Sequence, residues 1–242
     1  MIEEEVKRRR NHLTLPDDGN DLNHYIDRYD GGIRYTDDRI AEFLTALEAR
    51  GLRERTVLIV ASDHGDEFLD HGGWEHGGRV YEELVHVPLI FVWPGSENRV
   101  EDRPVSTLSI FATLAGILGV EPPENDGVDL GPLLRGDGEV ALPGFVLSQT
   151  GQSRPPFRDA VRHRDWKLVT DEAGRRIALY DLAVDPDERS DRSPNEGDRA
   201  EQLAEGRGAL GLAVAPGTVS SRPADEVDDD LRERLRALGY SE

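Results

Sequence analysis

The sequence predicts an α/β fold, in which a sheet is flanked by helices, followed by a small antiparallel α+β subdomain. Two short apolar runs without alternation are typical of buried strands. Helical patterns precede and follow these runs, and several short strand-like segments separated by turn residues come later in the 242-residue chain. A proline pair suggests a boundary, so we expect a first domain over residues 1–122 and a smaller one over residues 123–242.

The first predicted element is an amphipathic helix between Tyr25 and Arg50. Apolar residues recur there at steps of three and four, which places them on one helical face. Gly51 is well placed to end the helix. The sequence Asp30-Gly31-Gly32 interrupts the pattern, so we expect the helix to break or kink in its first turns.

Two strands and a short helix should follow. The runs TVLIVA (56–61) and VPLIFVW (87–93) read as strands buried on both faces of a parallel sheet. A helical patch at 81–84 lies between them, which gives the order strand, loop, helix, strand that is typical of α/β proteins.

The rest of the chain predicts one more helix and an antiparallel sheet. The pattern from Ser106 to Leu118 is helical and ends at Gly119. The segment DEAGR (171–175) has the composition of a hairpin turn, so its neighbouring strands should run antiparallel. The predicted strands span 145–149, 159–162, 167–170 and 177–181.

Two later segments are poor in large apolar residues. Residues 185–197 and 206–223 therefore read as loosely ordered, and the second leads into a partly disordered acidic tail. A last amphipathic helix is predicted at 226–238.

Composition excludes several classes of partner and site. A net charge of -20 opposes binding to a nucleic-acid backbone or an anionic membrane. The chain has no cysteine, which excludes disulfides, thiolate ligands and a cysteine nucleophile within it. No apolar run approaches the ~20 residues of a membrane helix, so we expect a soluble, cytoplasmic protein.

The charged residues also show a bias. Lysine occurs only at Lys7 and Lys167, whereas aspartate and glutamate are abundant throughout. This pattern favours a halophilic protein from a salt-rich cytoplasm. The alternative is a genome rich in GC combined with ordinary solubility.

Groups capable of metal binding and acid–base chemistry are concentrated in the loop SDHGDEFLDHGGWEHGGR (62–79). The loop directly follows the first strand, and ligands of open α/β sheets bind at the carboxyl ends of strands. Asp63 offers a carboxylate and His64 an imidazole, while Gly65 permits the sharp turn that would aim both at one ion. The alternative is that Asp63 caps the turn and His64 bonds a carbonyl group.

Three further side chains of this loop are candidates for contact with substrate. His71 and His76 could protonate a leaving group, and the planar Arg79 could pair with a sulfate or phosphate oxygen. Arg79 could instead pair with Glu82 or Glu83. The other acidic residues of the loop are interpreted as solvated charges: Asp66, Glu67 and Asp70.

Several segments, in this order, resemble the sulfatase family of the alkaline-phosphatase superfamily. They are YDGGIRYTDDRIAEFL (29–44), the stretch from TVLIVASDHG to VPLIF (56–91), DAVRHRDWKLV (159–169), LYDLAVDPDERSD (179–191) and RALGY (236–240). These segments resemble the C-terminal portion of such enzymes. The resemblance therefore implies an incomplete alkaline-phosphatase-like sheet.

The resemblance also implies roles for individual residues. In the family, the SDHG segment supplies an aspartate and a histidine to the metal, which are Asp63 and His64 here. A later histidine or lysine contacts the leaving oxygen, which implies His76 or, second, His71. Arg79 stands where many sulfatases have lysine. The family's nucleophile region precedes these segments, and nothing between Met1 and Tyr25 matches it.

From this resemblance we expect a hydrolase of sulfate esters, acting on a small molecule or a glycan with a divalent metal. The expected ion is Ca²⁺, with Mg²⁺, Mn²⁺ or Zn²⁺ as alternatives. The chain alone should be inactive and should need a separately encoded N-terminal half, or associate with itself. Two alternatives remain open: a phosphoester or phosphonate hydrolase or phosphoethanolamine-transferase relative, and a non-catalytic binding protein that retains the fold.

Overall fold

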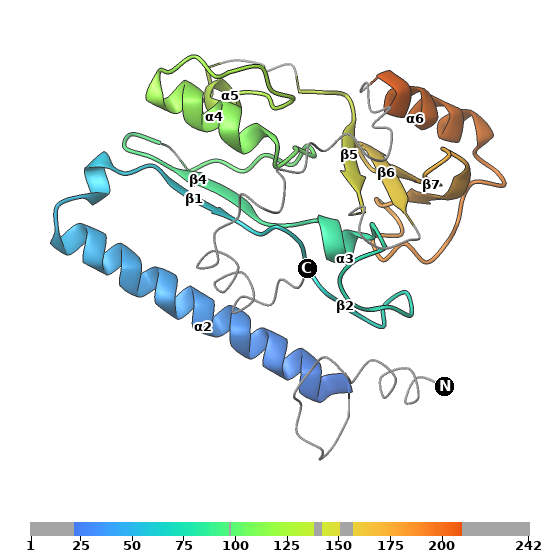
Figure 1. Cartoon of the computed structure of the whole chain (residues 1–242), viewed down its shortest axis with the longest axis horizontal. Helices are drawn as coiled ribbons and strands as arrows, with labels where there is room; N and C mark the ends of the chain where they lie inside the picture. Colours follow the sequence, from blue (N-terminus) through green and yellow to red (C-terminus); the bar gives the residue numbers. More distant parts are fainter. Residues whose placement is uncertain (1–21, 97, 138–141, 151–156, 210–242) are drawn as a thin grey trace, which may run out of the picture.

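The computed structural model describes residues 22–96, 98–137, 142–150 and 157–209. The larger described sheet has four strands and another has two, β1 (Leu58–Ala61) and β4 (Leu89–Val92). In Figure 1 this pair lies between the long helix and two shorter helices, and the larger sheet lies beside them. None of the described helices is both long and apolar enough to cross a bilayer. In chain order the elements are α2 (Leu22–Ala49), η2 (Arg53–Arg55), β1 (Leu58–Ala61), β2 (Glu67–Phe68), β3 (Trp74–Glu75), α3 (Glu82–Val85), β4 (Leu89–Val92), α4 (Ser109–Leu118), α5 (Gly131–Arg135), β5 (Val146–Gln149), β6 (Arg158–His163), β7 (Trp166–Asp171), β8 (Arg176–Asp181) and α6 (Gly197–Ala209).

Helix α2 confirms the first predicted helix but not the predicted break. It continues through Gly31 and Gly32, and a Cβ atom added at either glycine would meet nothing within 4 Å. Each glycine weakens the helix by only ~1 kcal/mol, which is too little to interrupt so long an element. The helix ends as predicted, because Gly51 has φ +64° and the Leu52 N–H donates to the Leu47 carbonyl at 3.0 Å.

Strands β1 and β4 lie where the sequence predicts them, but the predicted parallel pairing is wrong. Leu58 pairs with Val92 and Ala61 with Leu89, so the two strands are antiparallel. The connecting loop therefore leaves and re-enters the pair at the same end, and its helix α3 has only four residues, too few for a helical crossover. The predicted burial on both faces is also wrong, since Ile90 is 52% exposed and no third described strand joins the pair.

The predicted antiparallel sheet is confirmed in the second half of the chain. Strands β5, β6, β7 and β8 pair in that order, and each neighbouring pair is antiparallel. The turn at 171–175 closes with a hydrogen bond from the Asp171 N–H to the Arg175 carbonyl. Helix α6 was not predicted; it packs against one face of the sheet, where Leu168, Leu179 and Leu203 are fully buried.

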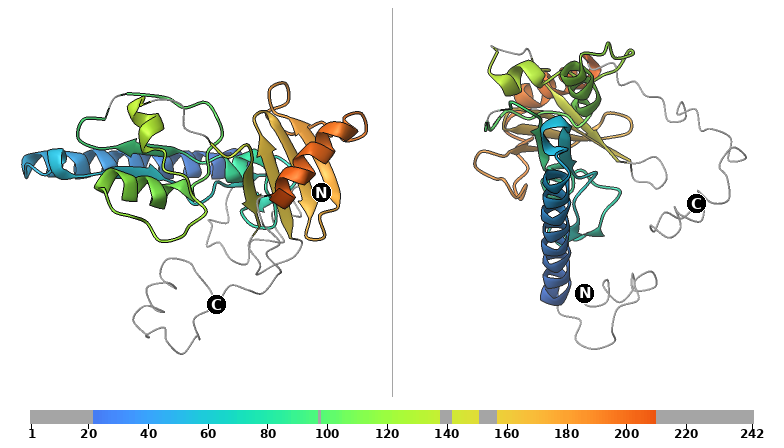
Figure 2. Two further views of the ribbon diagram at one scale, coloured as in Figure 1. Left: turned by 90° about the horizontal axis from the view of Figure 1, so that it is seen from above. Right: turned by 90° about the vertical axis from the view of Figure 1, so that its left-hand side faces the viewer.

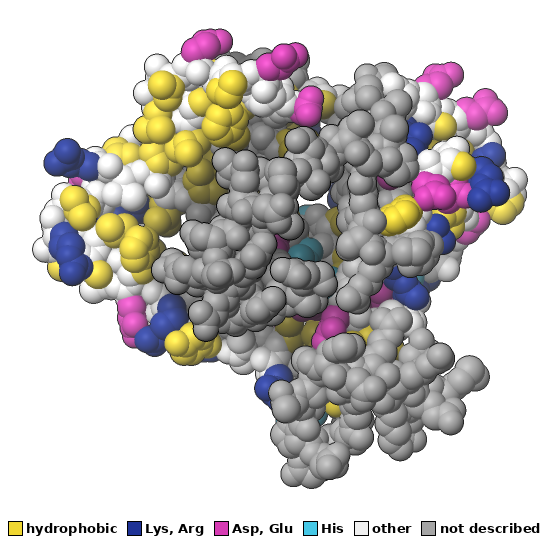
Figure 3. All heavy atoms as spheres, in the orientation of Figure 1, with side chains coloured by type: hydrophobic (Ala, Val, Ile, Leu, Met, Phe, Trp, Pro, Cys, Tyr) yellow, Lys and Arg dark blue, Asp and Glu magenta, His cyan; other side chains and the backbone are white. Residues whose placement is uncertain are grey.

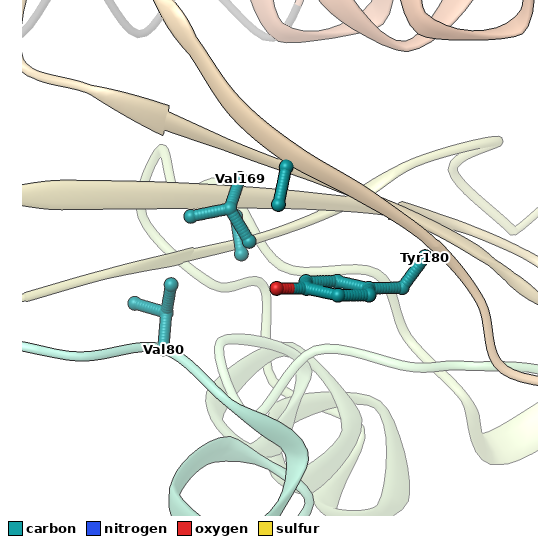
Figure 4. Packing of buried hydrophobic residues seen from close by; sticks show 5 residues of the cluster. Val80, Val169 and Tyr180 are labelled. Atoms are coloured by element: carbon teal, nitrogen blue, oxygen red, sulfur yellow. The ribbon is translucent and has the colours of Figure 1, made fainter. Parts of the chain in front are cut away.

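The other face of this sheet packs against the chain that precedes α3. Val80 and the side chains of Val169 and Tyr180 form part of one buried cluster, which Figure 4 shows from close by. This cluster joins the loop that follows β1 to the four-stranded sheet. The loop is therefore held by residues that come about 80 to 100 positions later.

Helix α4 confirms the predicted helix and ends at Gly119, which has φ +68°. The short helix α5, which the sequence pattern did not predict, packs on α4. The Leu130 N–H donates to the buried Thr113 hydroxyl at 3.0 Å. The division of the chain after residue 122 stays a prediction.

The prediction of loose order for 185–197 is wrong. This segment contains turns at 186–187 and 193–195, and Glu188 between them is only 2% exposed. Carboxylates accept main-chain hydrogen bonds there: Asp185 accepts from Arg189 and Ser190, and Asp191 accepts from Leu179. Order of this kind needs no apolar pattern. Of the second predicted loose segment, 206–209 end α6, and the remainder and the helix at 226–238 lie outside the described residues.

Candidate metal and substrate site

The loop of residues 62–79 is fixed at its start by Gly65. The Gly65 N–H donates to the Leu84 carbonyl at 2.9 Å, so the loop is bonded to α3. A Cβ atom at Gly65 would lie 2.1 Å from the Glu83 carbonyl oxygen, a distance that no side chain tolerates. Close packing of the backbone therefore requires glycine at this position, whereas its φ lies outside the left-handed region, so the backbone turn itself does not.

Asp63 and His64 lie directly after β1 and face each other. The Asp63 side chain is 73% exposed, and its Oδ2 lies 3.8 Å from His64 Nε2. Its Oδ1 accepts a hydrogen bond from the His64 N–H at 3.0 Å. Asp63 therefore caps the turn, as one of the two sequence interpretations predicted. Its second oxygen also lies near the His64 ring, as the other interpretation predicted.

The tautomer of His64 follows from its second contact. His64 Nδ1 lies 3.0 Å from the Gly65 carbonyl oxygen, which can only accept, so Nδ1 carries the proton. The lone pair of a neutral His64 is therefore on Nε2, the nitrogen nearer Asp63. This is the arrangement that metal-binding histidines in proteins generally adopt, so the two side chains fit a shared cation.

His76 lies against His64. The two ring centroids are 3.9 Å apart and the ring planes are tilted by 33°. His76 Nδ1 lies 2.9 Å from Asp66 Oδ1. His64, Asp66 and His76 each offer a ligand atom within 4.8 Å of the others, so the loop gathers two of the predicted residues with one that was interpreted as a solvated charge.

His71 has different surroundings from His76. Its side chain is 10% exposed, and its Nδ1 lies 2.7 Å from Glu83 Oε1. Its Nε2 lies 3.2 Å from the main-chain oxygen of Glu188, and its ring stacks on Tyr81 at 3.6 Å. Both ring nitrogens are thus engaged with protein acceptors. His71 connects the loop to α3 and to the turn that contains Glu188.

Arg79 pairs with Glu67, and not with Glu82 or Glu83. Its Nη1 donates to Glu67 Oε1 at 2.9 Å and to the His71 carbonyl at 2.6 Å. Glu67 is only 1% exposed, so its interpretation as a solvated charge is wrong. Glu67 Oε1 also accepts from the His71 and Gly73 N–H groups at 2.8 and 2.6 Å. These bonds close the loop on itself.

A second group of possible metal ligands shares residues with these hydrogen bonds. Glu67, His71 and Glu83 also offer ligand atoms within 4.8 Å of one another. The same Glu67 oxygen already accepts three hydrogen bonds, and His71 Nδ1 lies at hydrogen-bond distance from Glu83. We therefore assign this group to the structure of the loop.

Helix α3 links the loop to the four-stranded sheet through ion pairs that the sequence analysis did not predict. Glu82 Oε1 lies 2.9 Å from Lys167 Nζ, and Glu82 Oε2 lies 2.6 Å from Arg162 Nη1. Lys167 Nζ also lies 3.0 Å from Glu188 Oε1, so the two groups form an ion pair. By hydrogen-bond geometry, Glu188 Oε1 has no donor among the described residues. The available sequence signal was that Lys167 is one of only two lysines.

Two clefts flank this network. One, of about 500 Å³, lies between the segment around β4 and the strands β5 and β6, with Arg103, Arg162 and Lys167 among its lining residues. The other, of about 350 Å³, is lined by His71, His86 and Arg189 together with carboxylates. Neither cleft is lined by Asp63, His64 or His76.

Comparisons with known proteins agree with these features. The sequence model of the sulfatase family matches residues 4–120. The Delta 4,5-hexuronate-2-O-sulfatase of Bacteroides thetaiotaomicron is 28% identical over 228 residues, which is 90% of this chain and 46% of that protein.

Solved structures of a sulfatase and of a phosphonate monoester hydrolase are also similar to this chain. A 2-O GAG sulfatase superposes with a TM-score of 0.69 at 27% identity, covering 78% of this chain and 42% of the other. The phosphonate monoester hydrolase of Agrobacterium radiobacter superposes with a TM-score of 0.61 at 25% identity, covering 72% and 39%. This chain thus spans less than half the length of these relatives.

These likenesses confirm the expected fold class, an incomplete alkaline-phosphatase-like arrangement of helices and small sheets. Proteins of this kind generally use a divalent metal, and the loop after β1 carries groups that could bind one. The sequence match and the structural likeness together show that this chain belongs to the sulfatase family of the alkaline-phosphatase superfamily.

Proposed function

We propose that this chain is the metal-binding part of a hydrolase that cleaves sulfate esters. The observation that carries the proposal is the pair formed by Asp63 and His64, whose carboxylate and free imidazole nitrogen converge at the end of β1. Membership of the sulfatase family supports the same reaction class.

Asp63 and His64 would hold a divalent cation, for which Ca²⁺ is our first choice and Mg²⁺, Mn²⁺ or Zn²⁺ the alternatives. A bound divalent cation polarises the ester oxygens and stabilises the charge that develops on them. One carboxylate and one imidazole are fewer ligands than such an ion takes. Further ligands and the nucleophile would come from residues that these 242 do not include, for which we propose a separately encoded N-terminal half.

His76 is the better candidate for contact with the leaving group. Its Nδ1 is bonded to Asp66, which orients Nε2 as the nitrogen that can donate a proton to an ester oxygen. His71 is the weaker candidate, because Glu83 and the Glu188 carbonyl engage both of its nitrogens. We retain Arg79 as a possible substrate contact, although its Nη1 is bonded to Glu67 and His71.

The substrate would be a sulfated glycan or a small sulfate ester. The named relatives support this class, since one is a hexuronate 2-O-sulfatase and another a 2-O GAG sulfatase. The acidic composition supports our expectation that the protein works in a salt-rich cytoplasm.

Calorimetric titration with Ca²⁺ and Mn²⁺ tests the metal site. We expect Asp63→Asn to weaken the affinity at least about tenfold, because it removes an anionic ligand. The matched control is Asp37→Asn, which removes one exposed carboxylate of α2. Equal affinity in the wild type and Asp63→Asn would contradict the proposal.

A second candidate function is hydrolysis of phosphonate monoesters, favoured by the likeness to the Agrobacterium radiobacter enzyme. An assay of this chain reconstituted with the missing half on matched aryl sulfate and phosphonate esters separates the two. We expect faster turnover of the sulfate. The chain by itself should turn over neither ester, and turnover by the chain alone that Asp63→Ala abolishes would refute that expectation.

A further inference from the structure

We propose that Asp66 is a positioning residue of this site, whose carboxylate holds His76 through Nδ1 and so presents Nε2 to the ester. The inference rests on the proposed function and assigns a role to a residue that the sequence pattern marked only as a surface charge. The contact itself is an Nδ1–Oδ1 distance of 2.9 Å between side chains ten positions apart.

Asp66 is held at a fixed place in the loop. The residue before it, Gly65, is bonded to the Leu84 carbonyl and packs so closely on α3 that it admits no side chain. The Asp66 side chain is only partly exposed. The negative charge of Asp66 also acts on Tyr29 of α2. The pKa of Tyr29 is raised, mainly by burial of its own side chain and next by the charge of Asp66.

His76 is constrained on its other sides as well. Glu75 has φ +59°, Gly77 φ +100° and Gly78 φ +76°, so left-handed residues flank the histidine on both sides. The His64 ring lies against the His76 ring at 3.9 Å. With its backbone in tight turns, one face on His64 and Nδ1 on Asp66, the imidazole retains Nε2 for a ligand.

The carboxylate also determines which nitrogen carries the proton. An ionised carboxylate can only accept, so Nδ1 of His76 must donate and a neutral ring has its lone pair on Nε2. When the ring is protonated, Nε2 gains the second proton and Asp66 balances the charge of the imidazolium. The same division of labour between a carboxylate and a histidine occurs in other hydrolases.

The proton then has a defined path. An attacking oxyanion supplied from outside this chain forms the new bond to sulfur, and the bond from sulfur to the leaving oxygen breaks. The electron pair stays on the leaving oxygen, which takes the Nε2 proton and departs as an alcohol. The ring, which carries a proton on both nitrogens before this transfer, becomes neutral and keeps the proton on Nδ1, which stays hydrogen-bonded to Asp66.

Nitrogen NMR of the histidine side chains in the 242-residue chain tests this role. At about pH 9, where imidazoles are neutral, His76 should be protonated predominantly at Nδ1 in the wild type. In Asp66→Ala we expect the ratio of Nδ1-protonated to Nε2-protonated His76 to fall by about threefold or more. A ratio unchanged by the substitution would overturn the proposal.

Two further measurements separate a positioning role of Asp66 from misfolding and from metal binding. Asp66→Asn keeps the size of the side chain, so a smaller change in the same direction is expected even if Asp66→Ala does not fold. Asp66→Ala should keep its Ca²⁺ affinity within about threefold of the wild type, whereas Asp63→Ala should lose at least about tenfold. Equal losses in both would make Asp66 a ligand and overturn the positioning role. If the wild type binds no cation, the proposed function fails, and the NMR ratio still decides whether Asp66 positions His76.

Discussion

Lys167 is almost fully buried between two carboxylates, one on helix α3 and one in the turn after β8. Its ammonium nitrogen lies 2.9 Å from Glu82 and 3.0 Å from Glu188. Buried charges of this kind add little net stability as a set, but removing one member leaves its partners without compensation. Lys167 therefore matters for the attachment of α3, and of the loop of residues 62–79 before it, to the four-stranded sheet.

We expect Lys167→Ala to lower the free energy of unfolding by about 3–5 kcal/mol, because Glu188 then loses its cation inside the protein. Urea denaturation measures the change. The control is Arg34→Ala, which breaks an exposed pair with Asp38 and should cost less than about 0.5 kcal/mol. Equal effects of the two substitutions would contradict the buried network.

The titration of Glu188 should make stability depend on pH. Burial raises the pKa of Glu188 above its ordinary value of 4.5, against the opposing effect of Lys167. The folded state then binds this proton more tightly than the unfolded chain. The stability that this tighter proton binding gives the folded state is fully present below the ordinary pKa of Glu188. It is lost as the pH rises through the raised pKa.

We expect Glu188→Gln to reduce the fall in stability as the pH rises from about 4 to 7, because glutamine does not ionise. Urea midpoints at each pH give the measurement. A profile as steep as that of the wild type would show that Glu188 does not control this range.

Single residues also show how far sequence reasoning reached at the site. The Asp63–His64 pair was identifiable because adjacent residues after a strand share one environment. The contacts of Asp66 and Glu67 were not, since their partners lie 10 and 12 positions away across an irregular loop. No periodicity reports such a contact.

At the level of elements, the two glycines within α2 offer a direct test of how helix length compensates for poor formers. Gly31→Ala and Gly32→Ala should each stabilise the protein by about 0.5–1 kcal/mol, since both sites are open and helical. Thermal unfolding detects the gain.

The matched control at the end of the same helix is Gly51→Ala. Gly51 has φ +64°, so alanine there should cost about 1 kcal/mol or more despite the open space around it. A gain at Gly51, or a loss at both internal glycines, would contradict the described helix.

Most elements could be predicted from local patterns, whereas their pairing could not. Apolar runs located β1 and β4, and the Gly51 and Gly119 caps marked the ends of α2 and α4. The direction of the β1–β4 pair depends on where the long loop returns, which no pattern within either strand encodes. The same limit explains why the turns around Glu188 were missed.

At the scale of the whole molecule, large apolar side chains lie at the surface in more than one place. Figure 2 shows α2 along one side of the β1–β4 pair and α4 and α5 on the other. Hydrophobic side chains gather over the α4 and α5 end of the face shown in Figure 3. The exposed apolar residues of these elements include Ile33, Tyr35, Phe43, Ile90, Phe111 and Leu118.

We therefore expect the isolated chain to associate with itself, because exposed apolar surface favours burial between copies. Light scattering over a range of concentrations should give a mass above 26.9 kDa per particle. A stable monomer at all concentrations would contradict this expectation. Raising the salt concentration should strengthen association by screening the net charge of -20.

Anomalous diffraction from crystals soaked in Mn²⁺ would show whether Asp63 and His64 bind one cation together. We predict an anomalous peak within bonding distance of both the Asp63 carboxylate and His64 Nε2, with Asp66 still bonded to His76. A peak between Glu67 and Glu83 instead, with none at Asp63 and His64, would rule out a shared cation site at the end of β1.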